Sequence, residues 1–290
     1  MMEQPSESMV INGFQTQEDF AKLRDFLYEK TGLFFPDGKK YFLEPRFARR
    51  MAALNLSTFD QYHAYLRFKD SSKQELHQLV NEVTIQETSF FRNMPQMDGL
   101  QRVIVPELIK DRSRSIVSKL SIWSAACSTG EEPYSLAMIA AEHSKKELSG
   151  WNVRILATDI SSRALMTAQK GEYTQYSVRN MPKYFMQKYL KPVADKFTID
   201  PSIQKIVEFR QVNLSDDMTM VFLKGFDIIF CRNVLIYFDT KSKQKVIQHF
   251  YNNLNKGGYL FLGFSESLFG IDDRFKTVHF AGGMAYQKPF

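Results

Sequence analysis

The sequence predicts an α/β fold in which a mostly parallel sheet carries helices on both faces and follows a small all-α domain. From residue 97 onward, short apolar runs alternate with runs of helical spacing, which is typical of a parallel sheet. Residues 14–92 contain only helical patterns. We therefore expect a disordered tail over 1–13, a helical domain over 14–93 and an α/β domain over 94–290.

The front domain is expected to contain four helices. The first begins near Gln17, and the second runs over residues 40–54. Ser57 is expected to cap a third helix over 59–68, and a fourth covers 72–82, with Leu76 on its buried side.

Three arginines fall at i, i+3 and i+4 of the second helix and should share one face: Arg46, Arg49 and Arg50. Such a cluster is commonly a solvated helix face. The alternative is a docking surface for an acidic partner.

The α/β domain is expected to begin with a helix over 100–112. The expected strands cover 120–125, 153–158, 207–212, 226–231 and 259–264, and a hairpin pairs 275–280 with 284–288. Helices over 161–169 and 241–254 connect strands. Residues 171–205 are rich in Tyr, Lys and Pro and do not fit a plain crossover.

The turn after the first strand, residues 126–130, carries the strongest local signal. It consists of small residues and is followed at once by Glu131 and Glu132 at a helix start. The single Gly and the two acids argue against a phosphate site. A ligand with hydroxyls and positive charge, such as S-adenosylmethionine, suits this turn. An ordinary strand–helix turn, stabilised by acids at the helix dipole, is the alternative.

Composition narrows the class of protein. The chain has 290 residues, a net charge of +6, two cysteines and five histidines. The charge is compatible with an acidic protein partner or with RNA and decides neither. Two cysteines give no disulfide framework, so a cytoplasmic location is the simpler interpretation. The histidines show no ligand spacing, which predicts no metal site, and no apolar run is long enough for membrane insertion.

Polar residues collect at the carboxyl ends of the expected strands, where open α/β sheets bind ligands. Asp159 could bind ribose hydroxyls or cap the next helix. Asn213 and Leu214 could flank an adenine, although Asn213 could equally start a loop. Arg232 follows a buried strand and precedes Asn233. A charged side chain so close to the core needs a partner that compensates its charge. Tyr237 could line the place where the acceptor of a methyl group binds, or it could be an aromatic residue of the core.

Five motifs together carry a family resemblance. They are TSFFRN (88–93), WSAACSTGEEPYS (123–135), ILATDI (155–160), FCRNVLIYFD (230–239) and GGYLFLGFSES (257–267). With these motifs in this order, the chain resembles the CheR family, the S-adenosylmethionine-dependent glutamate methyltransferases of bacterial chemoreceptors. The resemblance implies a Rossmann-like class I methyltransferase sheet with a C-terminal antiparallel hairpin and a small β-subdomain inserted at 171–205.

The resemblance also implies roles for individual residues. Thr88 and Arg92 would reach the cofactor, Arg92 at its methionine carboxylate. Glu131 would take the amino-acid end and Asp159 the ribose. The pocket would be completed by Asn213, Leu214, Arg232 and Asn233. Gln86 stands where the family commonly has Asn, so the chain departs from the family pattern here. The longer Gln amide would have to make the contact with the cofactor.

The implied reaction moves a methyl group to a glutamate carboxylate and leaves S-adenosylhomocysteine. The acceptor is already ionised at neutral pH, so no general base is required, and Arg232 and Tyr237 are the candidates to orient it. The implied partner is the helical cytoplasmic domain of a chemoreceptor, docked on the arginine face. The insertion lacks the Gly-rich loop of tethering relatives, so we expect no binding of a receptor C-terminal pentapeptide.

Two alternatives remain open at this point. One is a methyltransferase acting on RNA or on a small molecule; basic and aromatic residues do not interleave along one stripe, which argues against nucleic acid. The other is a non-catalytic scaffold that senses the cofactor, against which the near-complete set of cofactor residues argues.

Overall fold

The computed structural model describes residues 17–112, 118–144 and 148–290. The chain divides into two compact units, residues 1–84 and 85–290, and the expected tail over 1–13 lies outside the described residues. The division precedes the expected boundary at 93 because Phe90 and Phe91 are buried in the core of the second unit. The segment that links the expected domains therefore belongs to the α/β unit.

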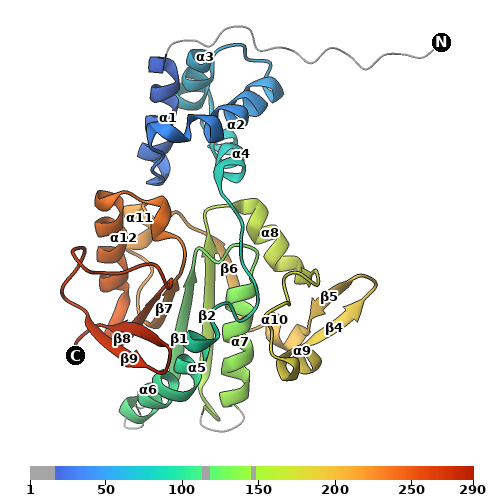
Figure 1. Cartoon of the computed structure of the whole chain (residues 1–290), viewed down its shortest axis with the longest axis vertical. Coiled ribbons are helices and arrows are strands. Elements are labelled where there is room, and N and C mark those ends of the chain that lie inside the picture. Colours follow the sequence, from blue (N-terminus) through green and yellow to red (C-terminus); the bar gives the residue numbers. More distant parts are fainter. Residues whose placement is uncertain (1–16, 113–117, 145–147) are drawn as a thin grey trace. The chain divides into compact units, whose positions relative to one another are not determined.

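The first unit is a group of helices (Figure 1). They pack around the buried rings of Phe20, Phe47 and Phe59. Its elements are α1 (Gln17–Thr31), η1 (Asp37–Lys39), α2 (Lys40–Ala53), α3 (Phe59–Ala64), the π-helical turn η2 (Tyr65–Lys69) and α4 (Gln74–Val83). Thr58 rather than Ser57 caps α3, since its hydroxyl accepts from the Gln61 amide. On α4, Glu75 is buried and Leu76 only half-buried, because Glu75 pairs inside this unit with Arg50.

The second unit is built on a seven-stranded sheet of order β6-β2-β1-β7-β8-β10-β9. Its strands are β1 (Lys119–Ala125), β2 (Asn152–Asp159), β6 (Val207–Gln211), β7 (Phe226–Cys231), β8 (Leu254–Leu262), β9 (Lys276–Phe280) and β10 (Gly283–Gln287). The five neighbouring strands β6, β2, β1, β7 and β8 run parallel to one another. β10 pairs antiparallel with both β8 and β9, so the predicted sheet and its closing hairpin are confirmed.

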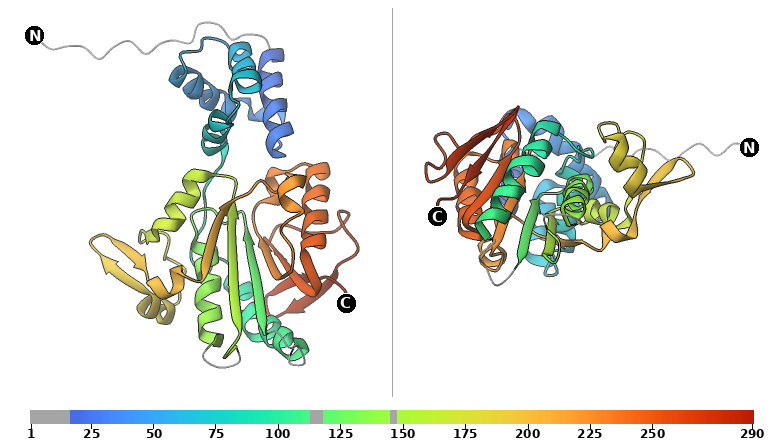
Figure 2. Two further views of the ribbon diagram at one scale, coloured as in Figure 1. Left: turned by 180° about the vertical axis from the view of Figure 1, so that it is seen from behind. Right: turned by 90° about the horizontal axis from the view of Figure 1, so that it is seen from below.

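Helices cover both faces of this sheet (Figure 2). The connecting helices are α7 (Glu131–Ser144), α8 (Ser162–Lys170), α11 (Asp217–Met220) and α12 (Thr240–Asn253). Neighbouring side chains on β1 point to opposite faces. Ile122 packs in the core that includes residues of α7, whereas the Trp123 ring lies 5.4 Å from that of Phe250 on α12. Both faces of the central strands are therefore buried, as their continuous apolar runs require.

The insertion contains a small three-stranded antiparallel sheet of order β3-β5-β4, so the predicted β-subdomain is confirmed. Its elements are β3 (Glu172–Tyr173), α9 (Lys183–Tyr189), β4 (Leu190–Val193), β5 (Lys196–Ile199) and α10 (Pro201–Gln204). Two aromatic residues connect it to the main core: Phe185 lies with its ring centroid 4.6 Å from that of Phe91, and Tyr173 is buried.

Two elements begin earlier than expected. The helix predicted from residue 100 begins at Met94 and continues as α5 (Met94–Gly99), the π-helical turn η3 (Leu100–Ile104) and α6 (Val105–Arg112). β8 begins at Leu254, so Gly257 and Gly258 lie within the strand, at a register irregularity. A Cβ on Gly258 would lie 2.9 Å from the Asn255 carbonyl oxygen, so only glycine fits the irregularity.

Across the described ranges, no helix is long and apolar enough to cross a membrane. In the same part of the chain, no group of three His, Cys, Asp or Glu side chains could hold a metal ion.

Candidate active site

The turn between β1 and α7 is held in an unusual backbone conformation. Ala126, Ser128 and Gly130 all have positive φ, at 59°, 52° and 96°. A Cβ on Gly130 would lie 2.7 Å from the Cβ of Ala168, so glycine allows the turn to approach α8. The Tyr173 hydroxyl donates to the Thr129 carbonyl at 2.8 Å and ties the turn to the β-subdomain.

Asp159, at the end of β2, joins this turn to the start of α8. Its two oxygens accept from the amides of Ser128 and Ser161, each at 2.8 Å. Ser161, not Asp159, is the N-cap of α8, so the capping alternative is wrong. The carboxylate is 5% exposed, and burial raises its pKa. Each oxygen can still accept a second hydrogen bond from a ligand.

Glu131 is the first residue of α7 and is 3% exposed. It accepts from the Thr129 hydroxyl at 2.7 Å. Burial raises the pKa of its carboxyl, and the Thr129 hydrogen bond offsets part of this effect. Neither Glu131 nor Asp159 has an ion-pair partner closer than 4 Å in the described chain. The Ser177 hydroxyl and the more distant charge of Arg179 also oppose the rise in the Glu131 pKa. Two buried carboxylates without a contacting cation among the described residues suit a ligand that brings its own positive charge.

The segment 86–92 is anchored by its two phenylalanines. Phe90 donates its amide to the Ser177 carbonyl at 3.0 Å, and Phe91 donates to the Ser135 hydroxyl on α7 at 3.0 Å. Thr88 is half-buried and Gln86 exposed. The Arg92 guanidinium donates to the Glu87 carbonyl at 2.8 Å. This segment therefore crosses the start of α7 and is fixed there by backbone contacts.

Arg232, which follows β7, finds its partner in Glu132. Its Nε donates to Glu132 Oε2 at 2.8 Å, and its Nη1 donates to the Arg92 carbonyl at 2.6 Å and to Gln96 Oε1 at 3.1 Å. The Ser124 hydroxyl donates to the other Glu132 oxygen at 2.7 Å. The Arg232 side chain is 3% exposed, and it bridges four segments beneath the candidate site.

The loop after Arg232 is held by one carboxylate, that of Glu266. Its two oxygens accept four backbone amides at 2.7–2.9 Å, those of Asn233, Val234, Leu235 and Gly263. Asn233 adopts a positive φ of 61°. The loop continues into η4 (Leu235–Tyr237), where Tyr237 is half-buried.

Tyr237 lies in the electrostatic field of the segment 86–92. Burial raises its pKa, the Glu87 carboxylate adds to the rise, and Arg92 opposes it. Arg92 and Glu87 therefore both act electrostatically on the Tyr237 hydroxyl.

Asn213 and Leu214 follow β6 at the same edge of the sheet. Asn213 Oδ1 accepts from the Ser215 amide at 3.0 Å, and Leu214 is buried. The hydroxyls of Ser128 and Ser215 are buried and lack a hydrogen-bond partner within the described residues. They are available to a polar ligand at two of the loops predicted to bind one.

Local sequence patterns assign no role to Glu132, Gln96 or Glu266, all of which support this site. The signals were present for two of them: Glu132 stands beside Glu131, and Glu266 lies in the quoted GGYLFLGFSES motif. Arg232 lies 100 residues from Glu132, and three of the four amides that Glu266 holds lie 31–33 residues from it, beyond the reach of local patterns.

The three arginines of α2 are in different surroundings. Arg49 is 64% exposed and pairs with Glu82. Arg50 pairs with the buried Glu75 at 2.6 Å. Arg46 is half-buried, with its guanidinium 3.5 Å from the Phe42 ring centroid. The expected face is therefore open mainly at Arg49.

Comparison with known proteins covers both units. Residues 86–283 match the family model "CheR methyltransferase, SAM binding domain", and residues 18–84 match "CheR methyltransferase, all-alpha domain". Chemotaxis protein methyltransferase 2 of Vibrio cholerae is 38% identical over 94% of both chains. The chemotaxis protein methyltransferase of Borreliella burgdorferi is 36% identical over 88% of this chain and 90% of its own. The chain belongs to the CheR family of S-adenosylmethionine-dependent methyltransferases.

Proposed function

We propose that this enzyme transfers the methyl group of S-adenosylmethionine to glutamate side chains in the helical cytoplasmic domain of bacterial chemoreceptors. The products are glutamate methyl esters and S-adenosylhomocysteine. The relatives are named for chemotaxis, and the proposal places the reaction in the cytoplasm. The observation that carries it is the pair of buried carboxylates, Glu131 and Asp159, without a cationic partner within 4 Å in the described chain.

The described residues fit this cofactor. Glu131 would bind the ammonium of its amino-acid end, and Asp159 the ribose hydroxyls. Asn213 and Leu214 would flank the adenine, while Thr88, Arg92 and Asn233 would close the pocket. Gln86 is exposed, and its longer amide would be the outermost contact. When bound, the cofactor supplies an electrophilic methyl group on a sulfonium.

The acceptor requires orientation rather than activation. A glutamate with a pKa of about 4.3 is ionised at neutral pH, so the enzyme needs no general base. Tyr237 is our candidate for the group that contacts the acceptor. Arg232 has three protein partners and is almost fully buried, which supports a positioning role beneath the site. The rate would then come from alignment and from exclusion of water.

The first unit is our candidate for receptor docking, with Arg49 as the exposed charge on α2. Arg46 and Arg50 support that surface through their contacts with Phe42 and Glu75. We propose that no receptor pentapeptide tethers the enzyme. β4 and β5 are joined by Ala194 and Asp195 alone, which leaves no long Gly-rich loop between them.

A single-turnover assay with labelled cofactor tests the function. The purified enzyme is mixed with cytoplasmic fragments of candidate chemoreceptors, and the product is treated with mild base. Base-labile label on the receptor supports glutamate methylation. Base-stable label on RNA or on a small molecule supports the alternative substrate class, and cofactor binding without transfer to any of them supports a scaffold. Micromolar binding of a receptor C-terminal peptide in calorimetry would contradict the untethered mode.

A further inference from the structure

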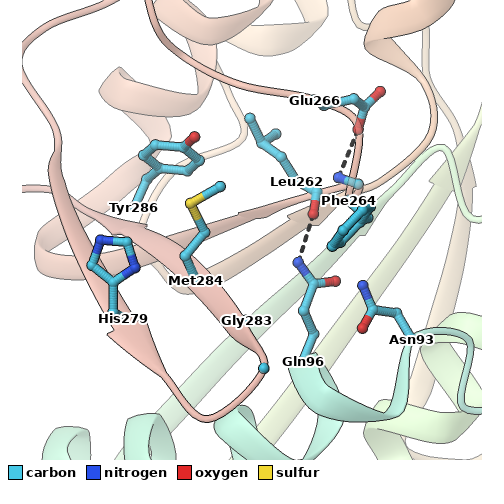
Figure 3. Close-up of a pocket in the computed structure, with 11 residues that line it drawn as sticks. Asn93, Gln96, Leu262, Phe264, Glu266, His279, Gly283, Met284 and Tyr286 are labelled. Atoms are coloured by element: carbon cyan, nitrogen blue, oxygen red, sulfur yellow. Dashed lines mark hydrogen bonds between the residues drawn. The ribbon is translucent and has the colours of Figure 1, made fainter.

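A pocket opens beside the loop that follows Arg232, on the side of the β9–β10 hairpin (Figure 3). It has a volume of about 260 Å³. Gln96 of α5 forms one wall, and Met284 of β10 the opposite one. Gly263, Phe264 and Glu266, which follow β8, also line the pocket.

The pocket shares a wall with the loop expected to face the acceptor. A Cβ on Gly263 would lie 2.8 Å from the Asn233 amide nitrogen and 3.1 Å from Asn233 Nδ2. Glu266 lines the pocket and also holds the amides from Asn233 to Leu235. The pocket therefore adjoins the loop that leads from Asn233 to Tyr237, our candidate for the contact with the acceptor.

Two of the polar side chains that line the pocket, Glu266 and Gln96, already have protein partners, and Asn93 and His279 line it as well. Glu266 accepts four backbone amides. Gln96 donates to the Leu262 carbonyl at 2.7 Å and accepts from Arg232. An occupant does not need to supply hydrogen bonds to either group. The remaining surface is mostly apolar, and Phe264 is 86% exposed. These features favour an apolar occupant over a charged one.

We propose that this pocket receives an apolar side chain of the acceptor protein, about one helical turn from the methylated glutamate. Residues three or four apart on a helix lie on the same face, with Cβ atoms about 5–6 Å apart. One side chain can then enter the pocket while the glutamate reaches Tyr237. The proposal rests on the proposed function and adds a specificity determinant to it.

The test replaces a residue that lines the pocket with a larger one, so that its side chain fills the pocket. Met284→Trp should raise KM for the receptor fragment about tenfold or more, because burial of one Leu-sized side chain is lost. The turnover number at saturation and the affinity for S-adenosylhomocysteine in calorimetry should stay unchanged. The matched control is Thr277→Trp, an exposed residue of β9 outside the lining, which should leave KM unchanged. Phe264→Ala, at a position whose side chain is largely exposed, should raise KM severalfold.

A double-mutant cycle identifies the occupant. Apolar residues of the receptor fragment, three or four positions from the glutamate, are replaced by Ala one at a time. One replacement should raise KM with the unmodified enzyme and have no further effect with Met284→Trp.

An unchanged KM in both Met284→Trp and Phe264→Ala overturns the pocket assignment and leaves the methylation intact. A weaker affinity for S-adenosylhomocysteine in Met284→Trp also overturns it, because the pocket would then belong to the cofactor site. If the unmodified enzyme makes no base-labile ester on any receptor fragment, the proposed function fails and the assignment fails with it.

Discussion

Arg232 Nε donates to Glu132 Oε2 at 2.8 Å, and the two side chains are only 3% and 10% exposed. Removal of one partner from a buried ion pair leaves an uncompensated charge. We therefore expect Glu132→Ala to lower the free energy of unfolding by about 3–5 kcal/mol, measured by urea denaturation. The exposed pair Arg154–Glu208 is the control, and Arg154→Ala should cost less than about 1 kcal/mol. Equal losses for the two variants would contradict the importance of the buried pair.

Glu131→Gln should separate stability from binding. Burial raises the pKa of the Glu131 carboxyl, so its ionised form destabilises the ligand-free protein. The neutral amide should raise the free energy of unfolding, and its Oε1 can still accept from Thr129. The affinity for S-adenosylhomocysteine should fall roughly ten- to hundredfold, since a hydrogen bond between charged groups is lost. Calorimetry measures the affinity and urea denaturation the free energy of unfolding of the same samples. A variant that is less stable and binds S-adenosylhomocysteine with unchanged affinity would contradict the prediction.

The same carboxyl predicts a pH dependence. A raised folded-state pKa means that, at pH values above it, the charged group lowers stability; the penalty disappears as pH falls to the unfolded value of about 4.3. The difference in unfolding free energy between Glu131→Gln and the unmodified enzyme should therefore shrink as pH falls. Affinity for S-adenosylhomocysteine should fall over the same window, because protonated Glu131 no longer attracts the ammonium. A flat affinity profile between pH 4.5 and 7, tested in steps, would argue against this contact.

Glu266→Gln should loosen the loop that carries Asn233. The amide has one acceptor oxygen where the carboxylate has two, so two of the four backbone amides lose their partner. We expect a loss of about 2 kcal/mol or more in unfolding free energy together with a lower turnover number. Glu172→Gln, at a half-exposed position on β3, should leave both quantities unchanged. Normal turnover in Glu266→Gln would mean that the loop does not need this carboxylate.

Charge reversal on α2 separates docking from folding. Arg49→Glu should raise KM for the receptor about tenfold through repulsion of an acidic partner, and raised salt should weaken the effect. Arg50→Glu should instead unfold the first unit, because it places a second carboxylate beside the buried Glu75. Lys69→Glu, at an exposed position of η2, is the control for charge alone. Methylation by Arg49→Glu at the unmodified rate would refute docking at this residue.

The fold was largely predictable because its signals are local. Apolar runs marked the strands of the sheet, and the polar residues that end them, such as Asp159 and Arg232, marked the ligand edge. The residues that hold the site in place through hydrogen bonds were not predictable in this way. Glu132 and Glu266 act on residues far away in the sequence, and only the packing of the sheet brings them together. Ser57 and Thr58 are equally good caps by composition, so the cap of α3 depended on the geometry of the loop.

The turn at Ala126–Gly130 has a consequence for how the enzyme meets its cofactor. Its left-handed residues are fixed by the sheet on one side and by Asp159 on the other, although alanine and serine disfavour that conformation. Because the surrounding contacts determine this conformation, we expect the bend to keep one shape with and without ligand. Association should then need little backbone ordering, and amide hydrogen exchange in this stretch should be slow without ligand and change little on its addition.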